Sequence, residues 1–100
     1  MDNERNCNMM KIFEIHTEEN EKEVDLGVHG VSSEDENFDE EDATIEAETE
    51  IANDFRSVGY KVEVQRTPEF SFIHAWNGDE DRRITIWAGI YSIVELYYRP

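Results

Sequence analysis

Four acidic residues recur at intervals of four in the middle of the chain, at Asp42, Glu46, Glu50 and Asp54. Four residues advance an α-helix by about 6 Å, so these carboxylates would form one line along a helix. Like charges at this spacing repel each other by about 0.2–0.5 kcal/mol per pair, and residues 42–54 contain no Lys or Arg that would relieve them. The phosphates of a DNA strand advance by about 3.4 Å each, which is a comparable scale. The row therefore predicts binding to a groove of Lys and Arg that normally holds nucleic acid, with a merely solvated acidic face as the alternative.

The acidic character extends beyond this row. Residues 1–54 hold 19 Asp and Glu against 3 Lys and Arg, whereas residues 55–100 hold 6 of each, so the first half carries the whole net charge of −16. A charge this uneven is informative about partners and solubility rather than about fold. The predicted partner-binding residues are the carboxylates around the row: Glu34, Asp35, Glu36, Asp39, Glu40, Glu41, Asp42, Glu46, Glu48, Glu50 and Asp54.

A helix must position these residues. Ala43, Ala47, Ile51 and Phe55 have the spacing of one buried helical face, and the acidic row lies one residue, or about 100°, behind them. We therefore expect a helix from about Asp39 or Glu40 to Ser57, with the row at its solvent-facing flank. Acidic residues at its start suit the positive end of the helix dipole, and Gly59 stands where a C-terminal cap is expected.

The remaining patterns predict strands. Isoleucine, phenylalanine and valine in period-two alternation indicate strands at 10–15 and 24–28, which would form an N-terminal hairpin, and at 60–65, 70–76 and 84–88. Asn77-Gly78 is a turn signal within a charged loop that reaches residue 83, and Gly89 marks a break or bulge. Residues 90–98 fit a helix by spacing and a strand by composition, and the composition favours the strand.

The fold class predicted from these elements is α+β. The elements follow in the order strand–strand–helix–strand–strand–strand, and the simplest packing is an antiparallel sheet with one helix packed on one face. Residues 1–9 lack apolar periodicity and predict a flexible tail. Residues 10–100 predict a single domain, which contains an acidic loop at 32–42.

Composition and spacing argue against several classes of function. The single cysteine, Cys7, excludes an intrachain disulfide, no stretch is apolar enough to span a bilayer, and the negative charge disfavours both anionic membranes and direct nucleic-acid binding. A cytoplasmic protein is the expected default. No phosphate-binding Gly loop or nucleophile constellation is present, so we expect neither an enzyme nor a cofactor.

Metal binding is not expected either. Asp35, Asn37, Asp39 and Glu46 match positions 1, 3, 5 and 12 of an EF-hand loop, but Glu40 stands where its sharp turn needs Gly. The three histidines, His16, His29 and His74, are too far apart in sequence to have a metal-binding spacing.

In size and composition the chain resembles the small acidic nucleic-acid mimics of phages and mobile elements, which include anti-restriction and anti-CRISPR inhibitors. The resemblance implies an inhibitor that occupies the nucleic-acid-binding surface of a basic target such as a restriction or CRISPR effector. An immunity protein or antitoxin against a nuclease and a salt-adapted acidic domain without mimicry are the alternatives. Nine of the 11 aromatic residues lie within 55–98. Seven of them form an aromatic group that we interpret as core and sheet surface rather than as a binding platform: Phe70, Phe72, Trp76, Trp87, Tyr91, Tyr97 and Tyr98. The sequence leaves open whether the protein is a monomer or a dimer.

Overall fold

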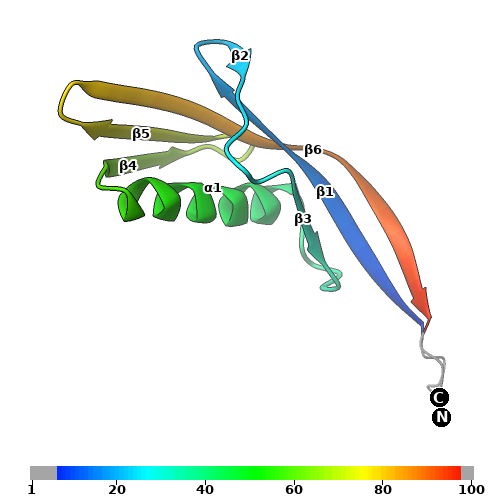
Figure 1. The fold of residues 1–100 in the computed structure, drawn as a ribbon. Coiled ribbons are helices and arrows are strands. Elements are labelled where there is room, and N and C mark those ends of the chain that lie inside the picture. Colours follow the sequence, from blue (N-terminus) through cyan, green and yellow to red (C-terminus); the bar gives the residue numbers. More distant parts are fainter. Residues whose placement is uncertain (1–6, 98–100) are drawn as a thin grey trace.

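The computed structural model describes residues 7–97, in which a single helix lies across one face of an antiparallel sheet (Figure 1). This arrangement confirms the predicted α+β class. Along the chain the elements are β1 (Cys7–Glu19), β2 (Lys22–Glu23), β3 (Gly30–Ser33), α1 (Glu40–Ser57), β4 (Lys61–Arg66), β5 (Ser71–Asn77) and β6 (Glu80–Tyr97).

The long strands β1 and β6 organise the sheet. The strand order is β2-β1-β6-β5-β4, and β3 also pairs with β1, from Lys11↔Ser33 to Glu14↔Gly30. Beyond α1, β1 and β6 continue together as a ribbon that projects from the rest of the molecule (Figure 1). We call this ribbon, residues 7–13 of β1 and 90–97 of β6, the arm, and residues 14–89 the body.

The helix begins and ends where the sequence predicts. Asp39 is its N-cap: the Asp39 carboxylate accepts from the Asp42 backbone N–H at 3.0 Å, and the Asp42 carboxylate accepts from the Asp39 N–H at 3.1 Å. This reciprocal capping box satisfies two N–H groups that the helix itself cannot. Gly59 follows the helix with φ +100°, a conformation that suits glycine after a helix end.

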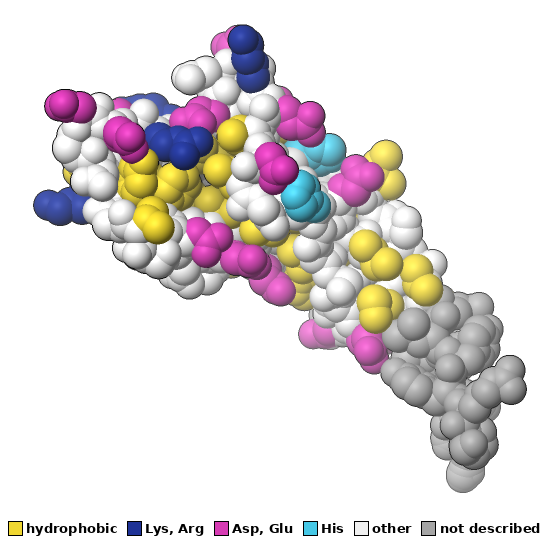
Figure 2. Space-filling model, viewed as in Figure 1, with side chains coloured by type: hydrophobic (Ala, Val, Ile, Leu, Met, Phe, Trp, Pro, Cys, Tyr) yellow, Lys and Arg dark blue, Asp and Glu magenta, His cyan; other side chains and the backbone are white. Residues whose placement is uncertain are grey.

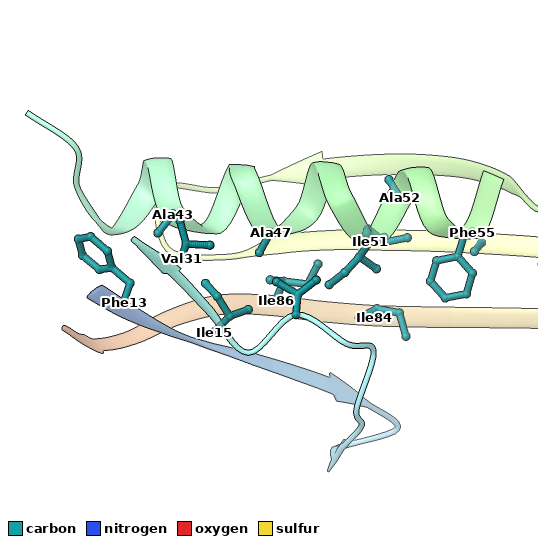
Figure 3. Packing of buried hydrophobic residues seen from close by; sticks show 13 residues of the cluster. Phe13, Ile15, Val31, Ala43, Ala47, Ile51, Ala52, Phe55, Ile84 and Ile86 are labelled. Atoms are coloured by element: carbon teal, nitrogen blue, oxygen red, sulfur yellow. The ribbon is translucent and has the colours of Figure 1, made fainter. Parts of the chain in front are cut away.

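The core lies between α1 and the sheet (Figure 3). Ala43 and Ala47 are at most 1% exposed, and their small side chains let the first half of α1 lie close to the strands. Burial of apolar surface contributes roughly 25 cal/mol per Å², so this layer is the main source of stability. Its other large members face the helix from the strands or continue its buried row: Phe13, Ile15, Val31, Ile51, Phe55, Ile73, Ile84 and Ile86.

The strand predicted at 24–28 is wrong. The side chains there do alternate, with Val28 buried and Val24 and Leu26 half-buried. The backbone nevertheless turns, because Gly27 has φ +86° and its N–H donates to the Asp25 carboxylate at 2.9 Å. The strand in this region is β3 instead, and it includes Ser32 and Ser33, which the sequence had suggested for the acidic loop.

The charged loop predicted at 77–83 is also wrong. Asn77 pairs with Glu80, so only Gly78 and Asp79 form the turn, and β6 already begins at Glu80. The charged residues of this stretch find partners within the sheet: Arg82 donates two hydrogen bonds to the Glu19 carboxylate, at 2.7 and 3.0 Å. Because Glu19 lies 63 residues from Arg82, the local pattern does not reveal this pairing.

The C-terminal segment is a strand. β6 runs without interruption to Tyr97, and its one irregularity lies at the predicted Gly89, since Phe13 pairs with Tyr91 but Ile15 with Ala88. At the other end of the arm, β1 starts at Cys7, so the predicted tail of residues 1–9 overlaps a strand at its last three positions. Residues 1–6 lie outside the described part of the chain.

Candidate partner-binding surface

Exposed acidic residues are concentrated in the loop before α1 and in α1 itself, although Glu40 lies on the helical flank opposite to the row, beside Phe70 and Trp87. Residues 34–54 contain 11 Asp and Glu and no Lys or Arg. Ten of the 11 are exposed, and a line of acidic side chains runs along α1 in Figure 2. We call these ten the acidic surface: Glu34, Asp35, Glu36, Asp39, Glu40, Glu41, Asp42, Glu46, Glu50 and Asp54.

The predicted row lies on this surface. Asp42, Glu46, Glu50 and Asp54 are all exposed, while the neighbouring row of α1, from Ala43 to Phe55, is buried against the sheet. Asp54 lies twelve positions after Asp42 on the helix, so the row is roughly 18 Å long. Within residues 7–97, no ion pair involves any of its four members. The row is thus a line of exposed charge on a helical backbone, and no ion pair within the described residues neutralises it.

Hydrogen bonds between residues close in sequence stabilise the acidic loop. Asp35 accepts from the Asn37 N–H through its carboxylate at 2.9 Å and from the Phe38 N–H through its carbonyl at 3.1 Å. Phe38 packs against Phe13, with 5.8 Å between ring centroids. Of the residues that match an EF-hand, Asp35 and Asp39 therefore serve a turn and a helix cap, respectively.

Lys11 fastens the same loop to β1. Its Nζ donates to the carbonyl oxygens of Glu36 at 2.7 Å and Phe38 at 3.1 Å, not to a carboxylate. The lysine that touches the loop therefore anchors its backbone and leaves its carboxylates to solvent. The sequence alone did not indicate this role, because Lys11 lies 25 residues from Glu36.

Glu48 is the exception among the predicted partner-binding residues, because it is buried and the prediction that it binds a partner is wrong. Its side chain is 4% exposed. Its carboxylate accepts from Arg66 at 2.6 and 3.0 Å and from the Ser71 hydroxyl at 2.6 Å, which joins α1 to β4 and β5. Burial raises the pKa of the Glu48 carboxyl, but the hydrogen bonds from Arg66 and Ser71 outweigh it and hold that pKa below its usual value.

The sequence contains a signal that Glu48 is buried. Thr44 and Ala52 lie one turn before and one turn after Glu48, and both are buried. This second row flanks the apolar face on the side opposite to the acidic row. A carboxylate between two small buried residues is expected to face the protein interior, where it needs a cationic partner.

An apolar hollow adjoins the end of the acidic row. It has a volume of about 250 Å³ and is lined by Leu26, Ile51, Asp54, Phe55 and Val58. Val58 is 67% exposed, and hydrophobic side chains are visible beside the C-terminal half of α1 in Figure 2. The sequence did not indicate this hollow, because Leu26 comes from the irregular segment between β2 and β3. The structure thus places a carboxylate, Asp54, at the edge of an apolar depression.

The predicted aromatic group lies mostly on the sheet face that α1 leaves uncovered. Trp87 stacks on His16 with 5.3 Å between centroids, and Phe70 contacts the Trp87 edge at 6.0 Å. Phe70 and Phe72 are somewhat more than one-third exposed. Tyr91 instead packs on Phe13 at the base of the arm. Phe70, Phe72 and Trp87 are therefore part of the sheet surface, and they do not border the acidic row.

Two further observations bear on function. Across residues 7–97, no group of three or more His, Cys, Asp or Glu side chains is arranged to hold a metal ion. In the same part of the chain, no helix has both the length and the apolarity to cross a membrane.

No protein-family model, curated protein or solved structure matches this chain.

Proposed function

We propose that this protein is an inhibitor that binds, through its acidic surface, the nucleic-acid-binding groove of a basic protein. The observation that carries the proposal is the row Asp42–Glu46–Glu50–Asp54, exposed on a capped and well-packed helix without an ion-pair partner among the described residues. A partner's Lys and Arg would bind the carboxylates of this row as they bind phosphates, and the cations associated with the carboxylates would be released.

Rigidity supports this use of the charge. The capping box, the Lys11 bonds and the buried alanines fix the backbone that carries the carboxylates before any partner arrives. A preorganised surface loses little conformational entropy on binding. The like-charge repulsion that the isolated protein tolerates would be relieved in the complex, so it favours association.

The apolar hollow supports a protein partner in particular. Charge complementarity speeds association and selects partners, but buried apolar anchors supply much of the affinity of protein interfaces. A partner side chain seated between Leu26 and Val58 would lie next to Asp54 at the end of the row. An anchor with an aliphatic stem and a cationic end, such as arginine, fits both features.

The uneven charge favours inhibition over salt adaptation. A salt-adapted domain would be acidic over its whole surface, yet residues 55–100 carry equal numbers of acids and bases. The proposed target is a nucleic-acid-binding effector such as a restriction or CRISPR nuclease. The proposal includes action in the cytoplasm, without direct contact to membranes or nucleic acid. A nuclease toxin, with this chain as its immunity protein, would use the same surface.

Competition with DNA tests the proposal. Restriction endonucleases and guide-loaded CRISPR nucleases are first bound to their cognate DNA. The protein is then added in increasing amounts, and DNA binding is measured by electrophoretic mobility shift. We expect at least one of these effectors to release its DNA in proportion to the protein added. Unchanged DNA binding across the whole panel would contradict the proposed class of target.

A further inference from the structure

The arm carries a feature that the acidic surface does not explain, which is an open edge of β6. β5 accompanies β6 only as far as the pair Ser71↔Ile86. The next N–H on that edge, at Ala88, donates to the Thr44 hydroxyl at 3.1 Å. From Gly89 to Tyr97 no described strand pairs with this edge, although β1 covers the other.

The side chains around the open edge are apolar and exposed. Ile90 is 79% exposed, Ile93 53% and Tyr91 46%, and Val94 and Ile12 are each more than one-third exposed. Hydrophobic side chains are visible along the arm in Figure 2. Natural proteins usually protect an edge strand with charges or prolines, but within 88–97 the only charged residue is Glu95. β3 joins β1 only from Lys11 onward, so residues 7–10 of β1 pair with β6 alone, and a two-stranded ribbon is only marginally stable by itself in water.

We propose that residues 90–97 of β6 pair antiparallel with the same residues of a second copy, which forms a symmetric dimer. Antiparallel pairing of one segment with itself is compatible with a two-fold axis, and each copy then contributes the same surface. The unpaired backbone groups provide the hydrogen bonds, as in other cases of strand addition. This inference does not depend on the proposed inhibitory function.

Charge identifies a second copy as the occupant. The arm contains one base, Lys11, and one acid, Glu95, so its net charge is zero, while the body contains 22 acids and 6 bases and carries −16. A basic partner is attracted to the body and gains nothing electrostatically at the arm. Two identical acidic bodies repel each other, and the neutral arm is where two copies can approach closely.

The geometry of the arm keeps the two bodies apart. Eight strand residues span roughly 26 Å, and antiparallel pairing places the bodies at opposite ends of this segment. The Debye length is about 8 Å at physiological salt, so most of the repulsion between the bodies is screened over that distance. The dimer would therefore present two acidic surfaces at its far ends.

Sedimentation velocity and hydrogen exchange test the dimer on the full chain. We expect twice the chain mass at high concentration, with dissociation on dilution. Ile90→Lys combined with Ile93→Lys places like charges across the pairing and should raise the dimer dissociation constant by at least about tenfold. Val58→Lys, which changes an equally exposed apolar residue on the body, should leave the dimer intact. Circular dichroism checks that both variants are folded.

Two results would overturn the proposal: a wild-type protein that stays monomeric at every concentration, or a folded Ile90→Lys/Ile93→Lys variant that dimerises like the wild type. If that variant fails to fold, hydrogen exchange of the wild type decides. Amide protection within 90–97 should rise with protein concentration, and exchange that is independent of concentration would contradict edge pairing.

Discussion

Glu48 and Glu50 lie two positions apart on α1 in opposite surroundings. The Glu48 side chain is 4% exposed and is bonded to Arg66 and Ser71, whereas Glu50 is exposed and has no ion pair within residues 7–97. The rotation of about 200° between them accounts for this contrast, because it turns one carboxylate toward β4 and β5 and the other toward solvent. The acidic stretch therefore both stabilises the fold and presents charge to a partner.

Glu48→Gln should destabilise the protein. The variant loses the charge of a buried hydrogen-bonding group, and bonds to charged groups contribute about 1.5–3 kcal/mol each. We expect the free energy of unfolding in urea near neutral pH to fall by about 1–3 kcal/mol. The loss is limited because the Arg66 side chain is exposed, so its guanidinium can form hydrogen bonds to water instead. Glu50→Gln is the matched control and should leave stability unchanged or slightly higher.

The pH dependence of this effect has a defined sign. Burial raises the pKa of the Glu48 carboxyl, but the bonds from Arg66 and Ser71 outweigh burial, so this pKa in the folded protein lies below the ordinary glutamate value of 4.5. Its contribution to stability is then complete above pH 4.5 and is lost as the pH falls through the lower, folded pKa. The difference in melting temperature between wild type and Glu48→Gln should shrink as the pH falls below 4.5. A difference that grows on acidification would contradict this assignment.

Phe55→Ala should destabilise the body without a direct effect on the acidic row. Phe55 is 6% exposed, contacts Tyr60 with 5.1 Å between centroids and lies under the Arg82 guanidinium at 5.3 Å. Truncation of a buried phenylalanine costs about 3–5 kcal/mol. Chemical denaturation measures the loss, and a change below about 1 kcal/mol would mean that the ring is not part of the core.

Asp39 should act through its capping bond rather than through its charge. Asp39→Ala removes the side-chain acceptor for the Asp42 N–H and should cost about 0.5–2 kcal/mol. Asp39→Asn keeps an effective N-cap while removing the charge, so it should retain most of the stability. Thermal melting of both variants separates the two roles, and an equal loss in both would assign the effect to charge.

The sequence predicted the elements that local signals define. The acidic residues at its start, the apolar row ending at Phe55 and Gly59 together indicate α1, and the acidic row follows from its spacing. The failures have two physical causes. A local one decides residues 24–28, where the Asp25 carboxylate and the positive φ of Gly27 turn a segment whose side chains alternate as in a strand. Contacts between distant residues decide the others, because Arg66 draws Glu48 out of the acidic stretch and Glu19 pairs with Arg82 in the predicted loop.

Salt should affect the two proposed associations differently. Complex formation with a basic effector depends on exposed charges, so its affinity should fall steeply as the salt concentration rises. Dimerisation through the neutral arm buries apolar groups, and screening by salt reduces the remaining repulsion between the bodies. The affinity of the dimer should therefore stay the same or rise with the salt concentration. Isothermal titration and sedimentation at low and high salt measure both. An affinity for the effector that does not change with salt would contradict charge mimicry.

The most direct test of the acidic row compares two double variants in the DNA-competition experiment. Glu46→Gln/Glu50→Gln removes two charges from the row, and Glu21→Gln/Glu23→Gln removes two from the exposed turn region around β2, so both have the same net charge. Thermal melting confirms that each is folded. We expect the row variant to need a much higher concentration than wild type to displace DNA, and the control to act like wild type. Equal potency of the two variants would contradict the account, because the row would then be only a solvated face of the helix.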